Sequence, residues 1–433
     1  MKKNRKKHLI IILVILIVLL CIDLCFFSKS LIQHNNSNNA QTEVAQEEKS
    51  DQLNVDLENT TDIESNENIE ETELDSNNET STDTNQKSSN NNELFGQYYD
   101  KADELLKTMT LEEKVGQMFL ARYPGTASAL NEIKTQHPGG YILFAKDFSE
   151  KNKNTMTSEL SKLQSNSNVP LFLAVDEEGG TVVRVSSYTA FRNSKFKSPQ
   201  DLYKVGGLQS ILEDSTEKSN LLKSIGLNMN LAPVVDIPTN SSSFIYARSF
   251  GKGAQETAEL TESLIKRMNE DNMISSMKHF PGYGDNVDTH TGVAVDKRDY
   301  TTFQNSDFLP FKGGIKADAP TIMVNHNIVN SMDKTKPASL SENVHKILRE
   351  ELNFSGLIIT DDLAMQAVRK YVTNGEAAVQ AVIAGNDMII SSDFKTQKQQ
   401  VIKAVQDGRI SEDTIDTAVR RILACKYAYG IIK

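Results

Sequence analysis

Hydrophobic and polar positions follow two different rhythms along residues 94–433. Short apolar runs bounded by polar or turn-forming residues are typical of buried strands, whereas longer amphipathic stretches are typical of helices. The short runs lie at 117–121, 140–145, 171–175, 229–235, 274–278, 320–325, 357–361 and 387–391. Helical patterns lie between most of them, for example at 254–270, 341–352 and 376–384, and a last one covers Ile410–Tyr429.

Eight strands with intervening helices predict an α/β fold, for which a (β/α)₈ TIM-like barrel is our first interpretation. A doubly wound open sheet is the alternative that the pattern leaves open. Thr110-Leu111-Glu112-Glu113 forms a capping box and predicts the start of a helix. Cys425 is the only cysteine of this block, so we expect a small core residue there and no internal disulfide.

The first 29 residues have the composition of a membrane segment. Residues 2–7 carry five basic groups, and the following nineteen residues, Leu9 to Phe27, contain a single charge at Asp23. A helix of that length spans roughly 28 Å, about one hydrocarbon core. We predict a cytoplasmic basic stub and a single-pass anchor that places the rest of the chain on the extracellular face. A cleaved signal peptide ending near Ser28-Lys29-Ser30, and hence a secreted protein, is the alternative.

Residues 30–93 form an acidic, low-complexity stretch without aromatic side chains. Residues 43–93 carry sixteen acidic and two basic groups, a net charge of −14, and residues 1–42 carry +5. Since the whole chain carries −11, only −2 remains for residues 94–433. Such a stretch cannot bury enough apolar surface to fold, so we predict a disordered linker. Residues 94–433 are then one large block, long enough for a single core.

Candidate chemistry gathers in residues 278–290, directly after one predicted strand. Lys278 and His279 stand at the strand's end, and Pro281, Gly282 and Gly284 force a loop. Asp288 and His290 lie two residues apart at the far end of that loop. An imidazole beside a carboxylate suits proton transfer. An Asp-x-His pair on its own is more often part of a polar surface loop, so this pair needs support from other segments.

Polar groups also follow other predicted strands, as expected for a barrel whose site lies at the carboxyl ends of its strands. They are Asp176-Glu177-Glu178-Gly179-Gly180, Asp236, Asn325-His326-Asn327 and Asp361-Asp362. A single strand that ends in a carboxylate is often structural, but five such ends predict a pocket. Because neighbouring strand residues face opposite sides, Asp361 and Asp362 should not share a role, and Asp362 suits a helix cap.

Lys-His-Phe-Pro-Gly at 278–282, followed by Asp-x-His at 288–290, resembles the signature of glycoside hydrolase family 3 in its β-N-acetylhexosaminidase (NagZ-type) branch. Three more segments are similar to motifs of this family, at 176–184, 248–251 and 360–365. The resemblance spans roughly residues 110–430, and four separated motifs make chance agreement improbable. The family's fold is a (β/α)₈ barrel, in agreement with the hydrophobic pattern.

The resemblance implies roles for eight residues. The first aspartate of the 360–365 segment is the family's nucleophile, and the histidine of the Asp-x-His pair is its general acid/base. The implied catalytic residues are Asp361, His290 and its partner Asp288, and the implied sugar-binding residues are Asp176, Arg184, Arg248, Lys278 and His279. Two positions depart from the family pattern, with Tyr283 where a histidine is usual and Thr181 where the first arginine stands.

Together these observations predict an exported, retaining β-N-acetylglucosaminidase that removes terminal N-acetylglucosamine from cell-wall-derived saccharides or muropeptides through a covalent glycosyl-aspartate. A β-glucosidase or a phosphorylase of the same family, or a glycan-binding barrel without activity, are the alternatives. We expect no cofactor and no metal, because His137 and His326 lack clustered ligand spacing. We also expect a monomer, and no nucleic-acid binding because there is no basic stripe.

Overall fold

The computed structural model describes residues 93–289, 292–372 and 374–433. The predicted stub and anchor (1–29) and residues 30–92 of the predicted linker lie outside these ranges. Over the described ranges, no helix combines the length and the apolar character needed to cross a bilayer.

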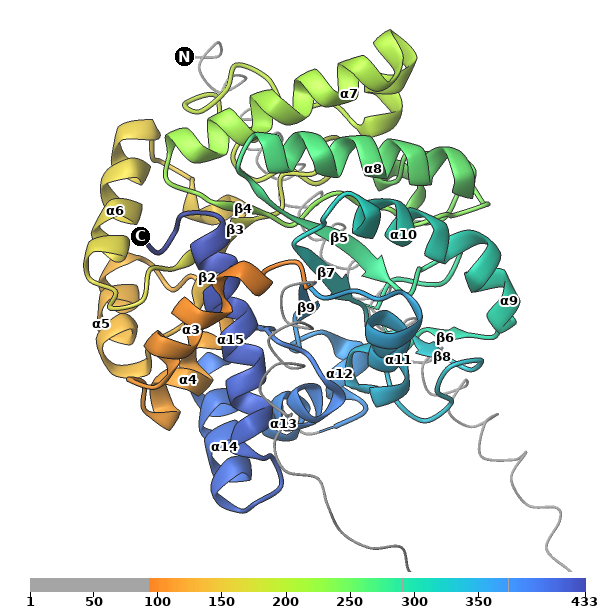
Figure 1. Cartoon of the computed structure of the whole chain (residues 1–433). Coiled ribbons are helices and arrows are strands. Elements are labelled where there is room, and N and C mark those ends of the chain that lie inside the picture. Colours follow the sequence, from red (N-terminus) through yellow and green to blue (C-terminus); the bar gives the residue numbers. More distant parts are fainter. Residues whose placement is uncertain (1–92, 290–291, 373) are drawn as a thin grey trace, which may run out of the picture. The chain divides into compact units, whose positions relative to one another are not determined.

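Eight parallel strands form a nearly closed barrel with helices around it (Figure 1). The strands are β1 (Phe119–Arg122), β2 (Gly140–Leu143), β3 (Phe172–Val175), β4 (Met229–Asn230), β5 (Ile274–Phe280), β7 (Thr321–Val324), β9 (Leu357–Thr360) and β10 (Ile389–Ser391). They follow one another in the order β10-β1-β2-β3-β4-β5-β7-β9, and a bridge between Ile359 and Met388 joins the two edges. The barrel prediction is confirmed, and the open-sheet alternative is wrong because its strand order would reverse at a switch point.

The helices connect successive strands over the outside of the barrel. They are α3 (Tyr99–Leu106), α4 (Leu111–Gln117), α5 (Thr126–Gln136), α6 (Lys153–Ser165), α7 (Pro199–Ser224), α8 (Ala254–Glu270), α9 (Tyr300–Thr302), α10 (Phe308–Lys316), α11 (Glu342–Lys346), α12 (Gln366–Arg369), α13 (Asn374–Ala384), α14 (Phe394–Gln406) and α15 (Glu412–Ala428). The predicted capping box opens α4, where the Thr110 hydroxyl accepts from Glu113 N and the Glu113 carboxylate accepts from Thr110 N.

Two predicted elements differ in extent from the structure. The predicted strand 229–235 is shortened to β4, because Pro233 has no N–H to donate to a neighbouring strand. The predicted helix 341–352 is regular only over α11 and continues as a π-helical turn at Ile347–Glu351. Cys425 is fully buried in α15, as predicted.

The loops at the carboxyl ends of β5 and β7 carry a small second sheet that the sequence pattern did not indicate. Its strands are β6 (Val295–Asp296) and β8 (Ile328–Val329), which pair in parallel. The long segment after β5, which contains Asp288, ends at β6. The pairing of β6 with β8 therefore fixes the far end of this segment.

Candidate active site

A cavity of about 440 Å³ opens at the carboxyl ends of the barrel strands. Its wall includes six of the predicted site residues, Asp176, Arg184, Arg248, Lys278, His279 and Asp361. The remaining lining residues are Ile142, Phe144, Glu178, Val182, Leu231, Met323, Asp362, Ala364, Met365, Gln366 and Ile390. The structure therefore brings together charged and polar side chains from the ends of four strands, β3, β4, β5 and β9, with apolar side chains between them.

Glu178 lies at the centre of a buried charge cluster. Its carboxylate accepts two hydrogen bonds from Arg248, at 2.9 and 2.7 Å, and pairs with Lys278 Nζ at 2.7 Å. Burial alone would raise the pKa of Glu178, but the charges of Lys278 and Arg248 hold it well below the ordinary range. Lys278 and Arg248 thus line the cavity as two fixed cations, and the buried Glu178 carboxylate balances part of their charge.

Lys278 connects Glu178 to Asp176, the carboxylate that the family resemblance assigns to sugar binding. Its Nζ lies 2.7 Å from Asp176 Oδ1, and only 2% of the side chain is exposed. Burial by itself would lower the pKa of Lys278, but Asp176 and Glu178 raise it above the ordinary value. Lys278 therefore remains a cation and can donate to an oxygen in the cavity.

His279 is oriented by two neighbours. Its Nδ1 lies 2.8 Å from Asp236 Oδ2, and its Nε2 lies 3.3 Å from Arg248 Nη2. Because a guanidinium group can only donate, this network assigns the proton to Nδ1 and leaves Nε2 as an acceptor. Lys278 and His279 both face the cavity because the register between β5 and β7 shifts between Lys278 and Phe280, which breaks the alternation of a regular strand.

Asp361 and Asp362 follow directly after β9. Asp361 Oδ1 accepts a hydrogen bond from Asp362 N at 2.8 Å, which orients the carboxyl group. Asp362 accepts from Ala364 N at 2.9 Å and from the Ser392 hydroxyl. The expectation that the two aspartates face opposite sides is wrong, because both line the cavity. Strand alternation no longer applies once β9 has ended at Thr360. Asp362 is not a helix cap either, since α12 has Met365 in that position.

Of the predicted acid/base pair, only Asp288 belongs to the described residues. Asp288 is half-buried in the segment after β5 and does not contribute to the cavity wall made by the described residues. His290 lies outside the described residues.

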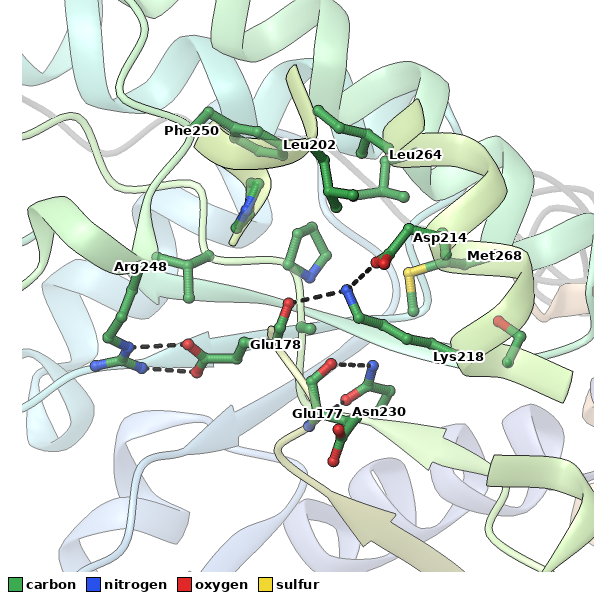
Figure 2. Close-up of a pocket in the computed structure, with 17 residues that line it drawn as sticks. Glu177, Glu178, Leu202, Asp214, Lys218, Asn230, Arg248, Phe250, Leu264 and Met268 are labelled. Carbon is green, nitrogen blue, oxygen red and sulfur yellow. Dashed lines mark hydrogen bonds and ion pairs between the residues drawn. The ribbon is translucent and has the colours of Figure 1, made fainter. Parts of the chain in front are cut away.

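A second, smaller cavity of about 40 Å³ lies behind the wall and shares Glu178 and Arg248 with the first (Figure 2). Lys218 of α7 reaches into it, where its Nζ donates to Glu178 O at 3.0 Å and pairs with Asp214 at 2.5 Å. Figure 2 shows the Arg248 bonds on the opposite side of Glu178. Glu178 is thus fixed through both its main chain and its side chain. Sequence reasoning missed Lys218 because nothing in a long helical pattern distinguishes a lysine that points inward.

Glu177 fixes the turn between Asp176 and Arg184. Its carboxylate accepts from the main-chain N–H groups of Arg184 and Val185, at 2.8 and 2.7 Å. The Asn230 side chain accepts from Glu177 N at 3.0 Å and donates to Glu177 O at 3.1 Å. Glu177 belongs to the same motif as Asp176, but it is fully buried and does not line the 440 Å³ cavity. Its role is therefore to hold the turn that carries Asp176 and Arg184.

Phe144 forms an apolar part of the cavity wall at the end of β2. The Arg122 guanidinium lies 4.2 Å from the centre of the Phe144 ring and is held by Asp147 at 2.6 Å. Asp147 also accepts from Phe144 N at 2.7 Å, so this aromatic wall is rigid. Arg184 lies nearby, 6.0 Å from the ring centre, and its buried Nε has no hydrogen-bond partner among the described residues.

The described residues contain no group of three or more histidine, cysteine or acidic side chains placed to hold a metal ion. His326, considered above as a ligand, instead contacts the Ser339 hydroxyl at 2.7 Å and Asp362 O at 3.1 Å. His137 stands at the end of α5 in a left-handed conformation.

Comparisons with known proteins agree on one family. The glycosyl hydrolase family 3 N-terminal domain matches residues 110–425. A β-hexosaminidase of Nitrosomonas eutropha is 31% identical over 305 residues, which cover 67% of this chain and 85% of that protein.

Solved structures give the same result. A glycoside hydrolase family 3 β-N-acetylglucosaminidase from Paenibacillus is 31% identical with a TM-score of 0.70, and the match covers 75% of this chain but 63% of that longer chain. A β-N-acetylhexosaminidase from Beutenbergia cavernae is 25% identical with a TM-score of 0.66, covering 74% of this chain and 99% of that one.

Proposed function

The chain belongs to glycoside hydrolase family 3, and from this premise we propose that it is a retaining β-N-acetylglucosaminidase acting on saccharides derived from the cell wall. The observation that carries this proposal is the convergence of Asp176, Arg248, Lys278, His279 and Asp361 on one cavity at the carboxyl ends of the strands. Two relatives, one named a β-hexosaminidase and the other a β-N-acetylglucosaminidase, support the choice of sugar.

We assign the attack on the sugar to Asp361. One carboxylate oxygen forms a bond to the anomeric carbon while the bond from that carbon to the leaving oxygen breaks, and His290 gives its proton to that oxygen. In the second step His290 takes a proton from water, and the water oxygen displaces Asp361 from the anomeric carbon. The hydrogen bond from Asp362 N keeps the Asp361 carboxylate oriented at the carboxyl end of β9.

The charge cluster supplies the sugar contacts in this proposal. Lys278 and Arg248 provide fixed donors, and Asp176 provides acceptor oxygens. His279 Nε2 holds Arg248 in place, and Arg184 has donor capacity at its Nε, which has no partner among the described residues. A sugar ring carries both donors and acceptors on its hydroxyl groups, so a wall of mixed, preorganised polar groups suits it. Phe144 adds an apolar surface for the carbon face of a ring.

Turnover of aryl glycosides by the purified protein tests the proposal. We expect release of the aryl group from a β-N-acetylglucosaminide, retention of the anomeric configuration by NMR, and little release from the matching glucoside. Adding inorganic phosphate separates a hydrolase from a phosphorylase, because a phosphorylase forms a sugar phosphate. No release from any glycoside, combined with binding of N-acetylglucosamine, would support the glycan-binding alternative.

The nucleophile is tested separately. Asp361→Ala should abolish turnover of the aryl N-acetylglucosaminide while thermal unfolding stays cooperative, because the covalent step loses its attacking group. Asp362→Ala, in the adjacent residue with local hydrogen bonds of its own, is the matched control and should keep measurable activity. The assignment is overturned if the two variants behave in the opposite way.

We also propose that Leu9–Phe27 anchors the chain and that the catalytic block acts outside the cell as a monomer. The support is the apolar run after five basic residues and the acidic stretch that follows it. Membrane fractionation and mass spectrometry of the mature N-terminus distinguish an uncleaved anchor from a secreted protein.

A further inference from the structure

Tyr283 occupies a buried position between the sugar-pocket wall and the segment after β5. Its side chain is 1% exposed, and its ring packs edge to face against His279 at 5.0 Å and against Phe244 at 5.1 Å. Its main-chain N donates to Asp236 Oδ1 at 2.8 Å. Asp236 therefore holds Tyr283 and the sugar-pocket histidine with the same carboxylate.

The hydroxyl group of Tyr283 makes a second connection. It hydrogen-bonds the hydroxyl of Thr289, which is fully buried and six residues further along the chain. The Thr289 carbonyl in turn accepts from Ala367 N of α12, at 3.4 Å. Thr289 directly follows Asp288, so one side-chain bond fixes the chain beside the predicted acid/base pair.

The base of the same segment is held independently by Arg298. Its guanidinium donates to Gly282 O at 3.2 Å and to the carboxylates of Asp296 and Asp307, at 2.7 and 3.0 Å. Gly284 packs against this guanidinium so closely that a Cβ atom there would lie 2.7 Å from it. The Tyr283–Thr289 bond is therefore a cross-connection inside a segment whose base is already fixed.

We propose that Tyr283 is a positioning residue for the acid/base step: its hydroxyl bond to Thr289 places the neighbouring Asp288, the predicted partner of the acid/base histidine, relative to the sugar pocket. This inference rests on the proposed function and deepens it. It also gives a role to the position at which the chain departs from the family pattern.

The environment of Tyr283 argues against the phenol as the acid itself. Burial raises its pKa well above the ordinary value, and the carboxylates of Asp361, Asp236 and Asp288 add to the shift. His279 is the other titratable group that packs against the ring. A phenol in this setting keeps its proton, so it is suited to holding Thr289 and poorly suited to protonating a leaving group.

The test compares Tyr283→Phe, Thr289→Val and the double variant with the wild-type protein. Tyr283→Phe keeps the ring that packs on His279 and loses only the hydroxyl. Tyr429→Phe is the matched control, because it removes a half-buried tyrosine hydroxyl bond, to Asn269 at 2.8 Å, at the amino-terminal side of the barrel. The first readout is kcat/KM over aryl N-acetylglucosaminides of graded leaving-group pKa. The second is hydrogen exchange of residues 284–299, and the third is the affinity for N-acetylglucosamine.

We expect Tyr283→Phe to lose about 10- to 100-fold in kcat/KM on the poorest leaving group, since misplacement by 1 Å can cost about 10²-fold. The loss should shrink on activated substrates that need little protonation. Amides of 284–299 should exchange faster, while the affinity for N-acetylglucosamine stays within about 2-fold because the pocket wall is intact. Thr289→Val should reproduce these effects, and the double variant should be no worse than either single variant, as expected for one shared interaction.

An equal loss on every substrate, additive effects of the two substitutions, or unchanged exchange of residues 284–299 would overturn the positioning role. These results are separate from failure of the proposed function. If the wild-type protein cleaved no N-acetylglucosaminide, the proposed function would fall, and the exchange comparison would still show whether the hydroxyl bond holds the segment.

Discussion

Glu178 shows how one buried side chain sets the electrostatics of the site. Its carboxylate pairs with Lys278 and Arg248, so both cations stay charged and fixed without a bound sugar. Donors that are already oriented need no reorganisation when charge develops during the reaction. The same pairing has a cost if broken, because removing one partner of a buried ion pair typically destabilises a protein by about 3–5 kcal/mol. Glu178 is therefore both a structural and an electrostatic part of the cavity.

At the scale of single residues, the rate gained from proton transfer by His290 should depend on the leaving group. Positioned proton transfer is typically worth about 10²–10⁴-fold, so His290→Ala should lose about that much kcat/KM on a poor leaving group and less on an activated aryl glycoside. Asp288→Asn should show the same trend more weakly, because the histidine remains to be oriented by other groups. The measurement is kcat/KM for three proteins across a series of aryl N-acetylglucosaminides.

A uniform loss across that series in His290→Ala would show that this residue does not protonate the leaving oxygen. An unaffected rate on the poorest substrate would show the same. The role would then have to pass to another group near Asp361.

At the scale of elements, α15 inserts a lysine into the amino-terminal side of the barrel, opposite the site. Lys426 is fully buried, and its Nζ donates to Gln117 Oε1 at 2.8 Å and to Gly139 O at 3.0 Å. It has no carboxylate partner among these contacts. Burial accordingly lowers the pKa of Lys426 to about 7.

This shift predicts how stability changes with pH. The unfolded chain keeps the lysine proton up to its ordinary pKa of about 10.4, whereas the folded protein releases it near pH 7. Between these values the unfolded state binds more protons, so this residue makes the protein more stable as pH rises. The gain from pH 7 to pH 9 should be roughly 2 kcal/mol, and Lys426→Met should remove it.

Denaturant unfolding at pH 7, 8 and 9 measures the effect. Lys398→Met is the matched control, since burial lowers the pKa of Lys398 to about 8. The rise in stability with pH that Lys398 contributes should therefore begin about one pH unit higher than that of Lys426. The same pH slope in the wild-type protein and in Lys426→Met would show that Lys426 does not titrate on folding in this range.

At the scale of the whole molecule, charge is divided unevenly along the chain. Residues 43–93 carry a net charge of −14, whereas residues 94–433 carry only −2. The acidity of the protein therefore says little about its substrate, and the cavity itself holds both signs of charge. Under the proposed membrane anchor, the acidic stretch would join the near-neutral block to the membrane.

This division predicts the outcome of limited proteolysis of the full-length protein. Cleavage should concentrate in residues 30–93, which have few apolar side chains to bury, and should leave a resistant fragment that begins near residue 94. Mass spectrometry of the fragments identifies the sites. Protection of residues 30–93 at protease levels that cut an unfolded control would contradict the linker prediction.

The hydrophobic pattern by itself predicted all eight barrel strands, because each contains a short apolar run bounded by polar or turn-forming residues. It did not predict β6 and β8, which have only two residues each. The capping box and the buried Cys425 were also predictable from the local sequence. Motif residues such as Asp176, Lys278 and Asp361 were found because they stand next to strand ends, and parallel strands bring their carboxyl ends together. Closure of the barrel needed the structure, since the sequential strand order and the bridge from Ile359 to Met388 together exclude an open sheet.

Contacts between distant segments were decided by the tertiary structure alone. Glu178 meets Arg248 and Lys278 across 70 and 100 residues of chain, and Lys218 reaches Glu178 from a helix whose pattern does not mark it. The pairing of Asp236 with His279, which are 43 residues apart, arises in the same way. The physical reason is that a side chain's partner depends on where the barrel places its neighbours in space, whereas the sequence pattern reports only which face of an element is buried.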